Sequence, residues 1–144
     1  MSKYLNFNVV TAERVVMSEE ATQVTIPTSE GEITVLPMHS PLVTILAPGV
    51  IEYKKPNGET ELAAVSGGFV EVLNDRVVIL ADTAERAEEI DLARAEEARK
   101  KAEAAIQDMQ EYDDVKFADF RAVMAREMAR TKAAQKWRHL KKTS

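Results

Sequence analysis

Hydrophobic and polar positions alternate in short runs along the chain up to Ala81. Leu5, Phe7 and Val9 alternate with polar neighbours, as expected for a strand with one buried face. Asn57-Gly58 and Asn74-Asp75 separate further runs and suit the positive φ of tight hairpin turns. The pattern predicts eight or nine short strands in a sandwich or closed barrel. The strands are predicted at residues 4–9, 14–17, 21–26, 32–36, 42–46, 49–54, 61–65, 69–73 and 76–80.

The period of the pattern changes at Ala81-Asp82, beyond which glycine and proline are absent. Apolar positions then recur at steps of three and four, which predicts a helix capped by Asp91. Small side chains bury little area at about 25 cal/mol per Å², so the helices should separate easily. Easy separation suits a switch, whereas composition alone favours a helical cap of ordinary stability. The seam comprises Ala95, Ala98, Ala102, Ala105 and Met109.

A second helix is predicted from about residue 114 to about residue 136, after a polar turn at residues 108–114. Folding the chain about Glu111 gives an antiparallel hairpin that hides the apolar stripes of both helices. The chain therefore divides into an all-β domain, residues 1–82, and a two-helix domain, residues 83–144. The apolar face of the second helix carries Phe117, Phe120, Met124 and Met128.

Charge divides the chain into three parts. Residues 1–81 carry 5 basic and 10 acidic side chains, residues 82–114 carry 5 and 12, and residues 115–144 carry 9 and 2. The basic end, residues 130–142 with Trp137, raises the possibility of nucleic-acid binding, but it lacks spaced aromatic side chains. We expect instead a solvated helix that pairs internally or reaches an acidic partner, and no nucleic acid.

Several classes of site are excluded by residue type. The chain has no cysteine, which excludes disulfides and thiolate metal sites. Its two histidines, His39 and His139, have no third ligand, which argues against a zinc site or a catalytic triad. No apolar stretch follows a charged start, and no run approaches the roughly 20 residues that cross a bilayer. These features favour a soluble, cytoplasmic protein.

Two arginines of the second helix form a candidate anion site. Arg126 and Arg130 are four residues apart and share a helix face. Folding the hairpin places Arg94 between them, with Glu85 and Asp91 near the same end. Three guanidinium groups and a helix N-terminus would hold a polyphosphate. The residues alone favour a simpler alternative, in which the two carboxylates pair with the arginines for about 0–1 kcal/mol.

Four motifs along the chain carry a resemblance to a known family. They are Leu36-Pro37-Met38-His39-Ser40-Pro41-Leu42, Ala47-Pro48-Gly49, Ser66-Gly67-Gly68-Phe69-Val70-Glu71-Val72 and Leu80-Ala81-Asp82-Thr83-Ala84. In this order they resemble the epsilon subunit of bacterial F-type ATP synthase, along nearly the whole chain. The resemblance implies an all-β sandwich of two five-stranded sheets followed by a C-terminal α-helical antiparallel hairpin. Thr34 and Met38 depart from the family, which often has glycine there.

The resemblance also implies a role and a set of partners. The chain would be a non-catalytic rotor subunit at the cytoplasmic face of the bacterial cell membrane, touching the membrane only through its complex. The sandwich would lie between the gamma subunit and the c-ring, with Glu30 and His39 near these contacts. The helices would fold back on the sandwich, or extend toward the alpha and beta subunits and block ATP hydrolysis. Residues 82–90 would act as the hinge.

Some members of this family bind ATP at the folded hairpin through a motif that residues 90–95 fit. No cofactor is required, and ATP would be a regulatory ligand that favours the folded state. A free-standing ATP-sensing module is the alternative. The resemblance implies a candidate ATP site formed by Glu85, Ile90, Asp91, Arg94, Ala95, Arg126 and Arg130.

Overall fold

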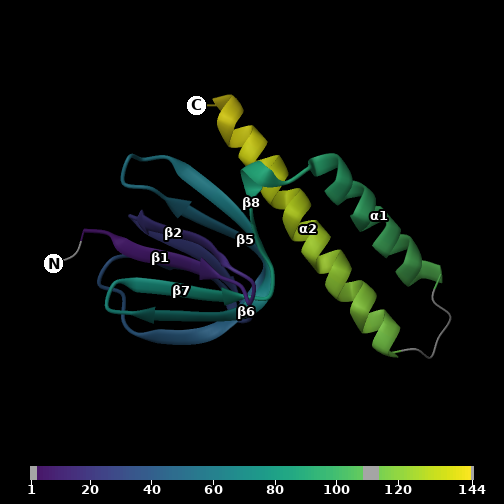
Figure 1. Ribbon diagram of the computed structural model, residues 1–144, viewed down its shortest axis with the longest axis horizontal. Helices are drawn as coiled ribbons and strands as arrows, with labels where there is room; N and C mark the ends of the chain where they lie inside the picture. Colours follow the sequence, from purple (N-terminus) through teal and green to yellow (C-terminus); the bar gives the residue numbers. More distant parts are fainter. Residues whose placement is uncertain (1–2, 109–113, 144) are drawn as a thin grey trace.

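The computed structural model describes residues 3–108 and 114–143. Within these residues, eight strands come first, followed by a short 3-10 helix and two α-helices (Figure 1). In chain order they are β1 (Leu5–Val10), β2 (Val15–Ala21), β3 (Gln23–Thr28), β4 (Gly31–Val35), β5 (Leu42–Lys54), β6 (Thr60–Leu73), β7 (Arg76–Ala81), β8 (Ala84–Arg86), η1 (Ala87–Glu89), α1 (Leu92–Asp108) and α2 (Asp114–Thr143).

The strands form two layers that share the two longest strands. In the first layer, β2, β1 and β7 are followed by the C-terminal half of β6 and the N-terminal half of β5. In the second layer, the other halves of β5 and β6 pair with β3 and β8, and β4 pairs with β3. The predicted sandwich is confirmed, with continuous pairing that joins its layers into one sheet. The pairing order ends at β2 and β4, so the described strands do not close into a barrel.

Glycines allow β6 to pass from one layer to the other. Gly67 and Gly68 have φ angles of +117° and +133°, which residues other than glycine rarely adopt. A Cβ atom on Gly68 would lie 1.9 Å from the carbonyl oxygen of Leu80. Four predicted strands therefore merge into two: residues 61–65 and 69–73 lie in β6, and residues 42–46 and 49–54 lie in β5.

The two predicted hairpin turns are both present. Asn74 and Asp75 have φ angles of 48° and 59° and connect the paired residues Leu73 and Arg76. Gly58, in the turn between β5 and β6, has a φ of 89°. These turns fix the register of the central strands, because both hairpins close where the sequence places residues that tolerate positive φ.

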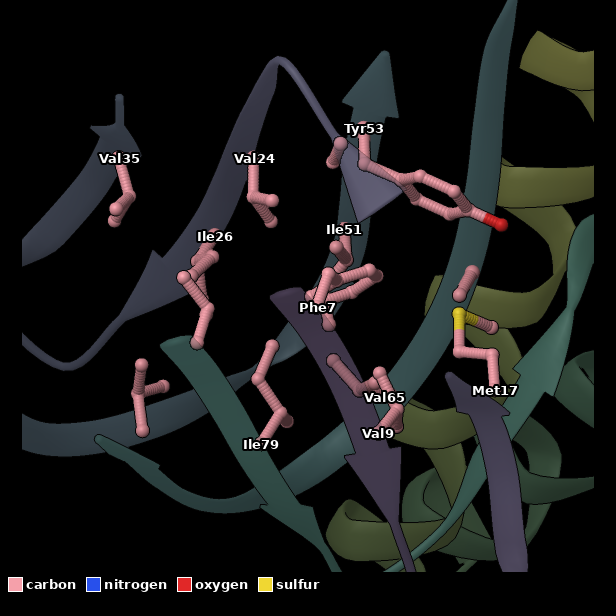
Figure 2. Close-up of a cluster of buried hydrophobic side chains, with 14 of the residues drawn as sticks. Phe7, Val9, Met17, Val24, Ile26, Val35, Ile51, Tyr53, Val65 and Ile79 are labelled. Atoms are coloured by element: carbon pink, nitrogen blue, oxygen red, sulfur yellow. The ribbon is translucent and has the colours of Figure 1, made fainter. Parts of the chain in front are cut away.

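Two hydrophobic clusters hold the molecule together. Side chains from both layers form the larger one, in which the rings of Phe7 and Tyr53 lie 4.9 Å apart between centroids (Figure 2). The smaller cluster lies between the second layer and the helices, and most of its members are alanines. Because alanine buries little area, this cluster holds the helices more weakly than the larger one holds the layers. Its buried members are Leu62, Ala64, Ala87, Ile90, Ala95, Ala129, Ala133 and Ala134.

Helix α2 lies between the sandwich and α1 (Figure 1). It continues to Thr143, beyond its predicted end, and Trp137 and Leu140 pack against the smaller cluster. The basic tail is therefore a helix that packs on one side, while Lys132, Arg138 and Lys142 are exposed to solvent as predicted. The predicted apolar face is partly wrong, because Phe117 and Met128 are exposed while alanines are buried. In the part of the chain described, no helix is both long and apolar enough to cross a membrane.

Helix α1 has the predicted cap and seam. Oδ1 of Asp91 accepts a hydrogen bond from the backbone N–H of Arg94 at 3.2 Å, which satisfies one of the free N–H groups of the first turn. Ala95 and Ala102 are buried, as the seam predicts. The last predicted seam residue, Met109, lies outside the described residues.

The predicted register of the hairpin is wrong. Nε2 of Gln135 donates a hydrogen bond to Oε1 of Glu96 at 3.3 Å, so the start of α1 lies beside the C-terminal part of α2. Arg94 is therefore displaced from the two arginines between which it was predicted to lie. Glu111, the predicted centre of the turn, lies outside the described residues.

Sheet pairing continues past residue 82, the predicted end of the β domain. Strand β8 pairs with β6, and Arg86 of β8 also reaches β2, where its Nη2 donates to Oε1 of Glu19 at 3.0 Å. Residues 87–91 then connect the sheet to α1. The part of the predicted hinge that lies between sheet and helix is therefore residues 87–90.

Candidate functional site

A cavity of about 330 Å³ lies where the sandwich meets α2. Guanidinium groups, carboxylates and one hydroxyl line it, over a floor of small apolar side chains from β6 and β8. A cavity of this kind suits a small anion with several oxygen atoms, because arginine donates to such oxygens in pairs. The lining residues are Arg14, Ala64, Val65, Thr83, Ala84, Glu85, Glu89, Arg126 and Arg130.

Arg130 is the centre of an ion-pair network beside this cavity. Its Nε donates to Oε2 of Glu85 at 2.8 Å, and its Nη1 donates to Oε2 of Glu127 at 2.8 Å. Burial lowers the pKa of Arg130, but the hydrogen bonds and charges of the two carboxylates outweigh it and hold this pKa above its ordinary value. The pair with Glu85 links β8 to α2, and so links the sandwich to the helices.

Glu127 is an acidic residue inside the interface. It is 2% exposed and lies between the two arginines in sequence. Its Oε1 accepts a hydrogen bond from Nε of Arg126 at 3.4 Å, a longer contact than the one with Arg130. Within the described residues, the Nη groups of Arg126 make no hydrogen bond or ion pair, so they are available to a ligand in the cavity.

The four motif residues among the candidates lie at the start of α1, outside the cavity lining. Ile90 and Ala95 are buried in the smaller cluster. Asp91 caps the helix, and its Oδ2 lies 3.7 Å from Nε of Arg94, whose side chain is 85% exposed. Of the seven candidates, the cavity brings together Glu85, Arg126 and Arg130.

Three charged residues of this region were missed from the sequence. Arg14 and Glu89 line the cavity, and Glu127 pairs with Arg126 and Arg130. Nothing in the local pattern links Arg14 to α2, because the two meet only through the fold. The sequence could have indicated Glu127, because residues 115–144 hold nine basic side chains and only two acidic ones. Glu127 is one of the two, and it lies between Arg126 and Arg130.

The predicted partner-contact residues lie on separate loops. Glu30 is exposed in the β3–β4 turn, where the backbone N–H of Ser29 donates to the carbonyl oxygen of Ile45 at 3.0 Å. His39 is half-buried in the β4–β5 loop, and its Nδ1 donates to the carbonyl oxygen of Ser40 at 2.7 Å. Both loops flank the N-terminal half of β5.

A row of apolar side chains crosses the outer face of the first layer. Ile45 pairs with Phe69, and Phe69 pairs with Leu80 on the next strand. Leu80 pairs with Val10, and Val10 with Val15, so the row spans five strands. Four of its members are between 53% and 61% exposed, while Val10 is half-buried. An exposed apolar surface of this extent is typical of a protein-binding face.

Comparison with known proteins identifies the family. Residues 4–87 match the family model described as ATP synthase, Delta/Epsilon chain, beta-sandwich domain. The ATP synthase epsilon chain of Chloroflexus aggregans is 49% identical over 131 residues, which cover 91% of this chain and 92% of the relative. This chain belongs to the ATP synthase epsilon chain family.

Other members and a solved structure agree with this assignment. The epsilon chain of Herpetosiphon aurantiacus is 53% identical over 115 residues, covering 80% of this chain and 84% of the relative. A chain in the cryo-EM structure of Euglena gracilis mitochondrial ATP synthase, OSCP/F1/c-ring, superposes with a TM-score of 0.77 at 26% identity, covering 90% of this chain and 80% of that one. As an epsilon chain, the protein is a structural or regulatory stalk subunit of ATP synthase and not its catalytic subunit.

Proposed function

We propose that this epsilon chain couples the catalytic head of ATP synthase to the c-ring and restrains ATP hydrolysis through its C-terminal helices. The observation that carries the proposal is the weak attachment of the helices to the sandwich. The smaller cluster is built mainly of alanines, and the ion pairs across the interface involve Glu85 with Arg130, Glu52 with Lys136 and Glu61 with Lys141. Because these contacts stabilise modestly, the helices can leave while the larger cluster keeps the sandwich folded.

The apolar row is the surface we assign to the rotor, that is, to the gamma subunit and the c-ring. Phe69 is the second member of the row, with Ile45 and Leu80 as its cross-strand neighbours. Glu30 and His39, on the flanking loops, would supply polar contacts at its margin. An apolar centre with a polar rim is the usual anatomy of a protein interface.

The inhibitory state is an extended one in which α2 has left the sandwich. A helix of 30 residues is about 45 Å long at 1.5 Å per residue, so α2 reaches far from the rotor surface. Residues 115–144 carry 9 basic and 2 acidic side chains, which suits an acidic target on the alpha and beta subunits. Since β8 stays paired with β6, we assign the bend to residues 87–91.

ATP is the regulatory ligand that we assign to the cavity, with no other cofactor required. Arg126 and Arg130 would donate to its phosphates, while Glu85 competes for Arg130 and so limits the affinity. A ligand held between β8 and α2 stabilises the docked helices in proportion to its preference for that state. ATP would therefore relieve inhibition.

The complex would hold the chain at the cytoplasmic face of the cell membrane, as a peripheral subunit. A free-standing ATP-sensing module is the second candidate, which the cavity alone would equally support. Co-purification separates the two, because only the rotor subunit stays with the ATPase. Phe69→Asp should abolish this retention, whereas Val115→Asp, at an exposed position of α2 outside the row, should not.

Truncation tests the inhibitory role. Ending the chain after Arg86 keeps β8 in the sheet and removes both helices. The assembled complex with this truncated subunit should hydrolyse ATP faster than the complex with the full chain. Equal rates, with the truncated subunit still bound, would contradict inhibition by the helices.

A further inference from the structure

Arg14 brings a third guanidinium group to the cavity, and it comes from the sandwich rather than from the helices. It lies in the turn between β1 and β2, where its backbone N–H donates to Oγ1 of Thr11 at 3.3 Å. The N–H of Thr11 donates in return to the carbonyl oxygen of Arg14 at 2.9 Å. The turn is thus fixed by its backbone and by the Thr11 hydroxyl, and the Arg14 side chain takes no part in holding it.

The three arginines differ in how many of their donors are already used. Arg130 is engaged by two carboxylates, Glu85 and Glu127. Arg126 uses only its Nε, in the 3.4 Å contact with Glu127. Among the residues that the structure describes, the guanidinium of Arg14 makes no hydrogen bond or ion pair, although it lines the same cavity. Free donors therefore face the cavity from both sides, from the sandwich through Arg14 and from α2 through Arg126.

We propose that Arg14 is a phosphate-binding residue, so that a polyphosphate in the cavity bridges the sandwich and α2. The proposal rests on the ATP site proposed above and adds a contact from the opposite unit. Glu89 lines the cavity as well and makes no ion pair within the described residues, so its carboxylate opposes an anionic ligand. Arg14 therefore raises the affinity for a polyphosphate, and Glu89 lowers it.

The bridge explains how binding would act on the helices. A ligand that contacted α2 alone would bind docked and undocked helices equally and would shift no equilibrium. Contacts to both units exist only while α2 lies on the sandwich, so binding stabilises the docked state. Through Arg14, a bound phosphate group contacts the sandwich as well as α2.

Calorimetric titration of the full chain with ATP, tripolyphosphate and adenosine tests this role. Arg14→Gln should weaken ATP and tripolyphosphate binding about tenfold or more, the usual effect of losing a charge-assisted hydrogen bond, and leave adenosine binding unchanged. The melting temperature without ligand should not change, because the side chain supports no contact. Arg76→Gln, at an exposed arginine of the sandwich outside this cavity, is the matched control and should bind like the parent. Glu89→Gln should bind tripolyphosphate more tightly.

The outcomes separate this proposal from the ATP site on which it rests. If Arg126→Gln loses ATP while Arg14→Gln binds ATP like the parent, the bridge is refuted and the ATP site stands. If the parent binds neither ATP nor tripolyphosphate at millimolar concentration, both are refuted, while the truncation experiment still decides on inhibition. A loss of tripolyphosphate binding in Arg14→Gln as large as that in Arg126→Gln supports the bridge.

Discussion

Replacing Arg130 with methionine should release α2 from the sandwich at a lower denaturant concentration. Methionine keeps an unbranched apolar stem like that of arginine, so the substitution removes the charge and the donors. The side chain of Arg130 is 24% exposed and donates to Glu85 of β8 and to Glu127 of its own helix. The variant therefore isolates the network that joins the helix to the sheet.

The expected cost has two parts. The Glu85 carboxylate is 31% exposed, so losing this pair costs about 0–1 kcal/mol. Glu127 is buried, and it would lose its 2.8 Å partner and keep only Arg126 at 3.4 Å. Leaving a buried charged group with a poorer partner costs about 1–3 kcal/mol. We expect a total loss of about 2 kcal/mol in the free energy of docking.

Trp137 provides the assay, because it is the single tryptophan of the chain and packs at the helix–sandwich cluster. Its fluorescence in urea follows the release of α2, while circular dichroism of the strands follows the sandwich. Arg138→Met, at an exposed position of the same helix, is the matched control.

Adding Glu127→Gln to Arg130→Met should recover the larger part of the loss, because no unpaired carboxylate then stays buried. The reasoning would be refuted if the free energy of docking in Arg130→Met, measured from tryptophan fluorescence, lay within about 0.5 kcal/mol of the parent value. The buried Glu127 carboxylate alone is expected to cost about 1–3 kcal/mol.

Two further predictions concern the sandwich. Gly68→Ala should lower the melting temperature far more than Gly58→Ala. Both glycines have positive φ, where alanine costs about 1–2 kcal/mol, but only alanine at position 68 places a Cβ against the carbonyl oxygen of Leu80. Equal shifts would contradict the close approach of β6 and β7 at this bend. Glu19→Gln should destabilise the protein at neutral pH. Burial raises the pKa of Glu19, but the hydrogen bonds of Tyr53 and Arg86 and the charge of Arg86 outweigh it, so the folded pKa lies below the usual value. The stabilisation is complete above the unfolded pKa, about 4.3, and is lost as the pH falls through the folded pKa. Parent and variant should therefore converge in acid; a constant difference in unfolding free energy would contradict this.

The local parts of the fold follow from the sequence. The turn at Asn74-Asp75, the cap at Asp91 and the alanine seam depend on residues close together in the chain, and all are present. The joining of four predicted strands into β5 and β6 depends instead on pairing across the sheet, at Gly67-Gly68. A local pattern indicates a break at such glycines, whereas the partner strands keep the ladder continuous.

The site is predictable to the extent that it lies on one face of one helix. Arg126 and Arg130 follow from their spacing of four. Arg94 was misplaced because the register of the hairpin depends on how the two helices pack against each other and on the sandwich, which the spacing does not reveal. Arg14 meets α2 only through the tertiary fold, so no spacing along the chain could have indicated it.

The central claim is that the helices leave the sandwich when hydrolysis is inhibited, and a distance measurement in the assembled complex tests it most directly. Asn57 and Thr143 line one cavity at the end of α2, and the chain has no cysteine to interfere with labelling. Spin labels at Asn57→Cys and Thr143→Cys should show a short distance in the isolated protein with ATP. In the inhibited complex the distance should lengthen by tens of ångströms, since α2 is about 45 Å long. The same short distance in a complex whose hydrolysis is inhibited would contradict the account.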